Sequence, residues 1–530
     1  MDRRPPPAPP VVARPARGPR PGGRAPDHPV EPRHAGGRPA GPRAGARMDD
    51  PRPGSRRSPE EEDPMTSGAV RAEEVHDYLN GHRDRIVEEL IGWVRVRSVA
   101  GVPEHGIDLV RSANWLAAAL RETGFPTVEV WDAGGAPAVF AQWCAEPEAP
   151  TVLVYSHHDV RAAKDEQWEE TPPFEPALRD ERLYGRGASD AKGQVLAHVW
   201  GVRAHLAATG RTAPAVNLKF LVEGEEEAGS PHFAALIEDH RDRLDADLVV
   251  FSDTLLWRAD HPAICTSVRG QLNAHIEVYG PLRDVHSGAV SGPAPNPVEE
   301  LCKLLGRLHD DKGRVALPGF YDDVAEPSER LRADLAALPF TEEDWLARSD
   351  TRTVGGEVGY TVLERLWARP AAEVLTVVAG DPVGVPRAAI PAVASADLSI
   401  RTVPDQTVAA VAARLRAWVA ETMGDKVRYE LTVAEENGQE PYRTPDDLPA
   451  VDALAAAVRD GFGTAPGRMG NAGGGPAELL ARSLDAPVVF FGTGLPEDRW
   501  HDSDERVLVD VLLAGAATLA CLWPRLADPS

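Results

Sequence analysis

The sequence is poor in cysteine, in positive charge and in long apolar runs. Its four cysteines form no Cys-x-x-Cys pair, which argues against a thiolate zinc knot and against a disulfide framework. The 57 lysine and arginine residues are outnumbered by 82 aspartate and glutamate residues, for a net charge of −25. This balance argues against nucleic acid or an anionic membrane surface as a partner.

No stretch approaches the roughly 20 continuous apolar residues that a membrane-spanning helix needs. The arginine-rich N-terminal segment is not followed by the apolar segment of a secretory signal. Reduced thiols are typical of the cytoplasm. We therefore expect a cytoplasmic protein with no membrane and no nucleic-acid partner.

Residues 1–64 differ from the rest of the chain in composition. Proline, arginine, glycine and alanine dominate, and no aromatic residue occurs. Such a segment cannot bury enough apolar surface to offset its conformational entropy, so it is predicted to be a disordered tail. It could be a basic tail that binds an acidic partner. The interpretation that we favour is a translation start at Met48 or Met65, which would leave the tail untranslated.

Short apolar runs alternate with helical patterns from Ala72 onward. The runs 151–155, 216–222 and 248–251 are typical of strands that are buried on both faces. Apolar residues with helical spacing occupy the segments between them and beyond them. This alternation predicts an α/β catalytic domain with a mainly parallel sheet flanked by helices. The other expected elements are helices over 72–97, 108–124, 193–209, 449–461 and 505–522, and strands over 127–131, 138–143 and 487–491.

The pattern changes after residue 266. Three segments alternate like half-exposed strands, and an amphipathic helix is expected over 297–308. These features predict a smaller α+β domain inserted into the first. We assign the catalytic domain to 65–266 and 438–530, and the inserted domain to 267–437.

Five side chains that can bind metal ions follow the expected strands or lie in short glycine-rich segments. Ligands of open α/β sheets bind in the crevice at the carboxyl ends of the strands. Two imidazoles and three carboxylates suit two divalent ions that share one carboxylate, with zinc favoured and manganese or cobalt as alternatives. Such a pair activates water for hydrolysis. The five residues are His157, Asp190, Glu227, Asp253 and His501.

Two of these segments allow finer assignments. Composition permits either His157 or His158 as a ligand, but Asp159 faces the same side as His157 on an extended chain and could hold its far nitrogen. An acidic run ends in Glu226 and Glu227 and could be a solvated loop. Because it follows a buried strand, we expect a metal ion to offset its repulsion. Glu227 could then bind metal while Glu226 accepts a proton from water.

Long segments around these residues resemble the M20 family of metallopeptidases, in particular its dipeptidase branch with carnosinase-like enzymes. The similarity extends over about residues 72–525. The segments that carry it include Leu183-Tyr-Gly-Arg-Gly-Ala-Ser-Asp, Asp284-Val-His-Ser-Gly, Pro318-Gly-Phe-Tyr-Asp-Asp and Glu364-Arg-Leu-Trp-Ala-Arg-Pro.

The resemblance implies roles for the candidate residues. Glu226 would be the general base, and Asp159 would orient His157. The peptide bond between Asp190 and Ala191 would be cis. One metal ion would be bound by His157, Asp190 and Asp253, and the other by Asp190, Glu227 and His501.

The resemblance also implies substrate contacts in the inserted domain. His286 would reach the scissile carbonyl oxygen from the partner subunit, which implies a homodimer built through a lid. Arg401 would pair with the terminal carboxylate of the substrate, a geometry that suits an arginine fork. Two departures are visible, because Ala191 replaces a second aspartate and the loop 470–476 lacks the usual glutamate and serine.

The predicted function is hydrolysis of dipeptides or short peptides that have a free terminal carboxylate. The altered loop favours, as an alternative, hydrolysis of an N-acyl or N-carbamoyl amino acid. A metal-binding or scaffold protein without catalysis would be expected to lack a base or a ligand, and none is missing here.

Overall fold

The computed structural model describes residues 71–132, 134–380, 384, 387–425 and 427–528. The tail predicted over 1–64 lies outside these residues. The four cysteines, all within the described ranges, are free thiols.

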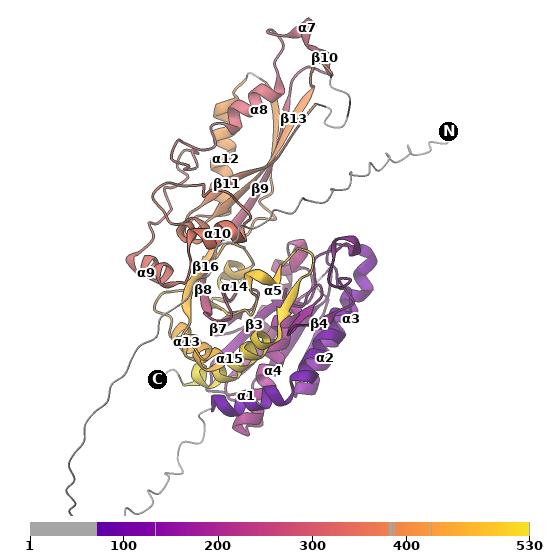
Figure 1. Ribbon diagram of the computed structural model, residues 1–530, viewed down its shortest axis with the longest axis vertical. Helices are drawn as coiled ribbons and strands as arrows, with labels where there is room; N and C mark the ends of the chain where they lie inside the picture. The colour runs from indigo at the N-terminus through magenta and orange to yellow at the C-terminus, as the bar shows by residue number, and fades with distance from the viewer. Residues whose placement is uncertain (1–70, 133, 381–383, 385–386, 426, 529–530) are drawn as a thin grey trace, which may run out of the picture. The chain divides into compact units, whose positions relative to one another are not determined.

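The central sheet has the strand order β1-β2-β6-β3-β7-β17, and Figure 1 shows its neighbouring strands β3 and β7. The pairs β6–β3, β3–β7 and β7–β17 are parallel, whereas β1–β2 and β2–β6 are antiparallel. The sheet is therefore mainly parallel, with an antiparallel arm at one edge. Its strands are β1 (Thr127–Trp131), β2 (Ala138–Trp143), β3 (Thr151–His157), β6 (Asn217–Glu223), β7 (Leu248–Phe251) and β17 (Val488–Phe490).

Helices cover both faces of this sheet, because its strands are apolar on both sides. In β3, Val152 and Val154 pack into one apolar cluster, and Leu153 and Tyr155 pack into another on the opposite face. The first cluster contains α1 (Ala72–Gly81), α2 (Arg83–Val94), α3 (Gly106–Thr123), α4 (Lys192–Thr209), α13 (Pro449–Phe462) and α15 (Val509–Ala527). The second contains α5 (Phe233–Asp239), α6 (Arg241–Leu244) and α14 (Ala477–Leu484).

Several element boundaries differ from the sequence prediction. The helix expected over 72–97 is two helices, because His82 leaves the helical conformation at φ −113° and ψ 10°. The helix expected from residue 505 begins only at Val509, because Arg506–Leu508 forms β18 against β5 (Arg182–Tyr184). The helix end expected at Gly124 is confirmed, with Gly124 in the left-handed conformation at φ 110°.

Among the described residues, one helix, α15, is long and apolar enough to cross a membrane by length and composition. However, 78% of its most apolar window is buried inside the fold. Core packing therefore accounts for its apolar composition.

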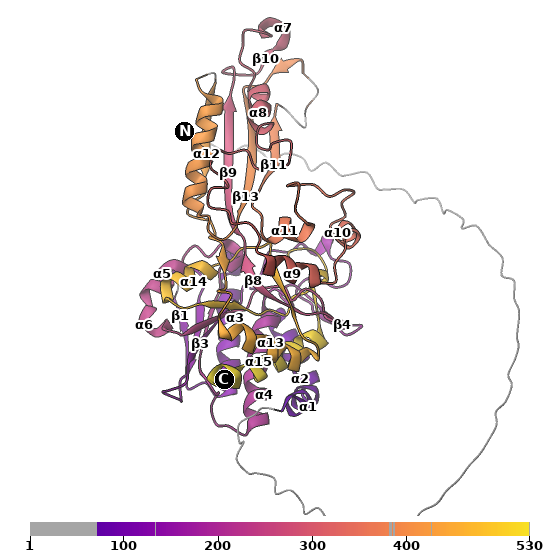
Figure 2. The same cartoon turned by 90° about the vertical axis from the view of Figure 1, so that its left-hand side faces the viewer.

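A separate antiparallel sheet forms within residues 270–433, in the order β11-β13-β9-β14. The helices α8 (Pro297–Leu305) and α12 (Val408–Met423) pack into its apolar cluster, and α12 runs alongside the strands (Figure 2). Its strands are β9 (Gly270–Tyr279), β11 (Ala371–Ala379), β13 (Val393–Thr402) and β14 (Arg428–Val433). The sequence prediction did not include the nearby helices α9 (Glu329–Ala337), α10 (Glu342–Arg348) and α11 (Val362–Trp367).

Short strands complete the described elements that bear on the site. β8 (Ala263–Val268) pairs with β15 (Tyr442–Arg443) and with β16 (Gly467–Asn471). β10 (Val285–His286) pairs with β12 (Ala389–Ile390). The exact domain boundaries stay predictions.

Candidate metal centre and active site

The candidate residues gather where parallel strands end. His157 is the last residue of β3, and Asp253 follows β7 by two residues. Glu226 and Glu227 begin a short 3-10 turn soon after β6 ends. Because β6, β3 and β7 are parallel neighbours, their carboxyl ends meet at one edge of the sheet, where such folds bind ligands.

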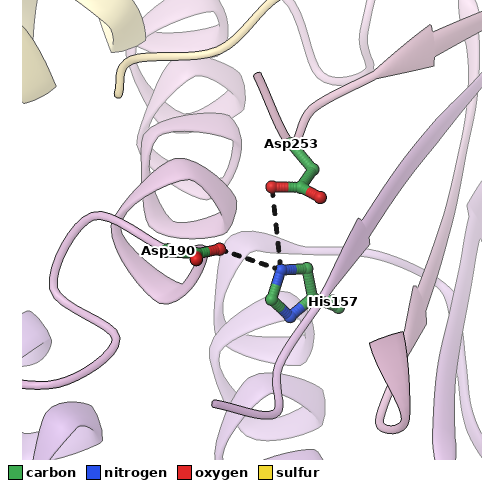
Figure 3. Close-up of side chains that lie close together, drawn as sticks. All are labelled: His157, Asp190 and Asp253. Atoms are coloured by element: carbon green, nitrogen blue, oxygen red, sulfur yellow. Dashed lines mark ion pairs between the residues drawn. The ribbon is translucent and has the colours of Figure 1, made fainter. Parts of the chain in front are cut away.

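One group of potential ligands consists of His157, Asp190 and Asp253 (Figure 3). Nε2 of His157 lies 3.2 Å from Oδ1 of Asp190 and 3.8 Å from Oδ1 of Asp253. His157 is fully buried, and Asp190 is 3% exposed. These distances place three donor atoms around one point that solvent barely reaches.

A second group shares Asp190 with the first. Nε2 of His501 lies 3.0 Å from Oδ2 of Asp190 and 3.1 Å from Oε2 of Glu227. Asp190 therefore directs one carboxylate oxygen toward each group. This is the arrangement needed for a carboxylate that bridges two cations.

The donor atoms of these groups fit metal ions. Four buried atoms make no hydrogen bond in the part of the chain that the structure describes: Nε2 of His157, Oδ2 of Asp190, Oε1 of Glu227 and Oδ1 of Asp253. Buried polar atoms without partners are unfavourable. Imidazole and carboxylate donors suit zinc, manganese or cobalt, so divalent ions would satisfy these atoms.

The charges in the site also favour the binding of metal ions. Burial raises the pKa of Glu226 well above its ordinary value, and the charge of Asp253 raises it further. Contacts with Asp190 and then Glu227 raise the pKa of His501 to about 10. Burial opposes ionisation of Asp190, but its close contacts with the imidazoles of His157 and His501 hold its pKa well below its usual range. The site therefore concentrates negative charge and attracts cations.

Asp159 contacts both sides of the site. Its backbone carbonyl lies 3.1 Å from Nδ1 of His157, and its Oδ1 lies 3.3 Å from the same nitrogen. Its carboxylate also accepts hydrogen bonds from the backbone N–H groups of Glu226 at 3.3 Å and Glu227 at 3.0 Å. Asp159 thus fixes the ring of His157 and the turn that carries the two glutamates.

The sequence also singled out two residues outside this cluster. His286 is exposed at the end of β10. Arg401 is half-buried on β13, where it pairs with Gln271 of β9 and Ala371 of β11. No contact between described residues joins either side chain to the two potential metal-binding groups.

The peptide bond between Asp190 and Ala191 is cis, as the resemblance implied. The altered loop 470–476 connects β16 to α14 and packs close to the site. A Cβ atom on Gly475 would lie 2.8 Å from the ring of Phe251, which ends β7. One on Gly474 would lie 2.1 Å from Oε1 of Gln439, so the glycines allow this close approach.

Sequence reasoning missed Glu505, which is fully buried behind the site. Its carboxylate accepts hydrogen bonds from the backbone N–H groups of Gly187, Ser189 and Asp190 and from Nη1 of Arg186. The only sequence feature that pointed to Glu505 was its position four residues after His501, and this is weak evidence for a role in the site.

A family model described as Peptidase family M20/M25/M40 matches residues 153–525. The chain belongs to this family. Human Beta-Ala-His dipeptidase is 29% identical over 452 residues, which cover 82% of this chain and 89% of that protein. Cysteinylglycine-S-conjugate dipeptidase of Corynebacterium striatum is 27% identical over 440 residues, which cover 81% of this chain and 92% of that protein.

Solved structures of M20 peptidases agree with this assignment. The crystal structure of human carnosine dipeptidase 1 matches with a TM-score of 0.73 at 28% identity, over 87% of this chain and all of that one. The M20 metallo-carboxypeptidase Sso-CP2 of Sulfolobus solfataricus also matches with a TM-score of 0.73, at 26% identity, over 83% of this chain and 99% of that one. The fold is thus the α/β fold of this family.

Proposed function

We propose that this M20 peptidase is a metal-dependent dipeptidase that hydrolyses the amide bond of dipeptides or short peptides with a free terminal carboxylate. The observation that carries the proposal is that Asp190 belongs to both groups of potential ligand atoms. Glu226, the candidate base, directly precedes the ligand Glu227 in the sequence. The relatives named dipeptidases support the same reaction.

His157, Asp190 and Asp253 would hold one divalent ion, and Asp190, Glu227 and His501 the other. When bound, such ions lower the pKa of water and polarise a carbonyl group. Zinc is the ion that we favour. No residue needed for this pair is absent from the site, so the alternative of an inactive scaffold has no support.

Glu226 is suited to move the proton. Its side chain makes no hydrogen bond or ion pair with any described residue, while Asp159 fixes its backbone. A carboxylate that is held in place but free of partners can accept a proton from water and pass it to the leaving amine. Asp159 would meanwhile keep the ring of His157 in one orientation.

The test is hydrolysis of mixed dipeptides by the protein purified with zinc or manganese. We expect activity that a chelator abolishes and added metal restores. Two equivalents of metal per subunit are expected in the active protein. Absence of chelator-sensitive hydrolysis of any amide would overturn the proposal.

We further propose a cytoplasmic homodimer built through β11. This strand lies at an edge of its sheet and exposes four apolar side chains: Val374, Leu375, Val377 and Val378, which are 38%, 61%, 51% and 51% exposed. An exposed apolar edge strand favours pairing with another chain. In such a dimer, the partner subunit's His286 would complete the site.

One observation favours the second candidate function, hydrolysis of an N-acyl or N-carbamoyl amino acid. A cavity of about 220 Å³ is lined by Leu255, Trp257, Trp345, Trp367 and Asn471, among others. Its lining residues, all within the described ranges, include no carboxylate to pair with a free amino group. An apolar acyl group would fit such a lining, so acylated amino acids should be compared with dipeptides of the same C-terminal residue.

A further inference from the structure

Arg269 lies directly before β9, the strand that pairs with the strand of Arg401. Arg401 of β13 pairs with Gln271 of β9, and Arg269 precedes Gln271 by two residues. Arg269 itself stands in the one-residue link between β8 and β9. The two long side chains therefore start from neighbouring parts of the fold, and the charge of Arg401 acts on Arg269.

Neither arginine has a carboxylate partner among the described residues. Arg269 is only 8% exposed, its Nε makes no hydrogen bond, and its Nη1 reaches only the carbonyl of Arg365 at 3.5 Å. The half-buried side chain of Arg401 makes no hydrogen bond or ion pair with the described part of the chain. A buried charge without a partner is strongly unfavourable.

One carboxylate, that of Glu373, acts on Arg269 but does not neutralise the pair. Glu373 of β11 attracts Arg269 but is exposed and forms no ion pair with it. Burial lowers the pKa of Arg269 to about 10, with a further contribution from the charge of Arg401. Both guanidinium groups are therefore charged at neutral pH, and without a bound anion the exposed Glu373 offsets their repulsion only in part.

The pair lies beside the altered loop 470–476. The backbone N–H of Arg269 donates to the carbonyl of Asn471 at 3.2 Å. A Cβ atom on Gly474 would lie 3.2 Å from the carbonyl oxygen of Arg269. Arg269 therefore joins the end of the sheet that carries Arg401 to the loop 470–476.

We propose that Arg269 and Arg401 together bind two carboxylates of one substrate, so that the enzyme prefers a C-terminal aspartate or glutamate. This inference rests on the proposed function. Arg401 takes the terminal carboxylate, and Arg269 takes the carboxylate of the acidic side chain. Guanidinium groups recognise carboxylates with strong, charge-assisted hydrogen bonds.

The test compares Ala-Glu with Ala-Gln, and Ala-Asp with Ala-Asn, as substrates of the full-length, metal-loaded protein. The members of each pair have similar shape and differ in one charge. We expect kcat/KM to be about 10-fold to 100-fold higher for the acidic member, in the range of a hydrogen bond to a charged group. Equal values within each pair would overturn the inference while leaving the dipeptidase function intact. Hydrolysis of other dipeptides but of none of these four would also overturn the inference, whereas absence of chelator-sensitive hydrolysis of any amide would overturn the function itself.

Variants test whether the preference for an acidic C-terminal residue depends on Arg269 and Arg401. Arg269→Met keeps the apolar stem and is expected to remove the preference, so that kcat/KM for Ala-Glu falls to about the value for Ala-Gln. Arg401→Met is expected to lower kcat/KM for both members of a pair. Arg428→Met, on the same sheet with an exposed side chain, is the matched control and should change neither.

A second measurement covers the case in which Arg269→Met does not fold. Glutarate, with two carboxylates, is expected to inhibit the wild-type protein at least about 10-fold more strongly than butyrate, with one. Arg269→Lys keeps the charge and should keep part of this difference. Equal inhibition by the two acids would count against the pair of arginines as a dicarboxylate site.

Discussion

The backbone N–H of Asp190 donates a hydrogen bond of 3.0 Å to Oε1 of Glu505. The backbone of the residue whose carboxylate would be shared by two metal ions is therefore held by a buried side chain 315 residues later in the chain. The same glutamate accepts a hydrogen bond of 2.6 Å from Nη1 of Arg186, and Nη2 of Arg186 donates to the carbonyl of Asp502 at 3.0 Å. These contacts tie the loop of Asp190 to the loop of His501.

Glu505→Gln should weaken metal binding. The amide keeps the shape of the side chain but removes the charge, and its N–H groups would oppose the backbone donors. Loss of a group that orients a metal ligand reduces metal affinity by about 10-fold to 100-fold. Metal titration measures this change, and a shift in the absorption bands of the cobalt-substituted protein would report altered ligand geometry. Glu497→Gln, at an exposed position of the same loop, is the control; unchanged affinity in both variants would exclude the positioning role.

Glu226→Gln should abolish turnover while metal remains bound. The amide cannot accept the proton, and loss of general-base catalysis lowers kcat by about 100-fold or more. Elemental analysis should still find two equivalents of metal, because Glu226 is outside both groups of potential ligands. Glu227→Gln is the contrasting variant and should lose metal. If Glu226→Gln retained full kcat, another group would have to be the base.

Glu223 should make the stability of the metal-free protein depend on pH. Burial raises its pKa to about 8, whereas an unfolded glutamate has a pKa of about 4.3. Between about pH 4 and pH 8, the folded protein keeps a proton that the unfolded chain has released. The free energy of unfolding should therefore fall as pH rises through this window.

Glu223→Gln should remove this part of the pH dependence. Its amide oxygen can still accept the hydrogen bond that Tyr155 donates to the glutamate at 2.7 Å. Urea unfolding of the chelated proteins should show the variant gaining stability relative to the wild type as pH rises. The exposed Glu436→Gln serves as the control. Parallel pH curves for wild type and Glu223→Gln would contradict the raised pKa.

The sequence predicted the parts of the site that depend on local pattern. Buried strands such as 248–251 are short apolar runs, and Asp253 follows this run by two residues, so its place at the edge of the sheet could be inferred. The role of Glu505 could not, because it depends on a contact between loops far apart in sequence. The break at His82 and the strand Arg506–Leu508 were also missed, since nearby tertiary contacts overrode a continuing helical pattern.

The proposed dimer can be tested at β11. Leu375→Lys together with Val377→Lys places charge on the exposed edge and should produce monomers, because charged edge strands resist pairing. Sedimentation or light scattering measures the change. Lys substitution at Val130, 37% exposed on another strand, is the control and should leave the dimer intact.

Subunit mixing tests whether the dimer shares its active site. Glu226→Gln and His286→Ala should each be inactive alone. In a mixed dimer, the His286→Ala subunit keeps its own Glu226 and receives the partner subunit's His286, so one of the two sites is complete. Random exchange between symmetric subunits makes about half of the dimers mixed, and activity should return to about a quarter of the wild-type value at equal total protein. If mixing restores no activity after subunit exchange has been verified, each site must be complete within one chain.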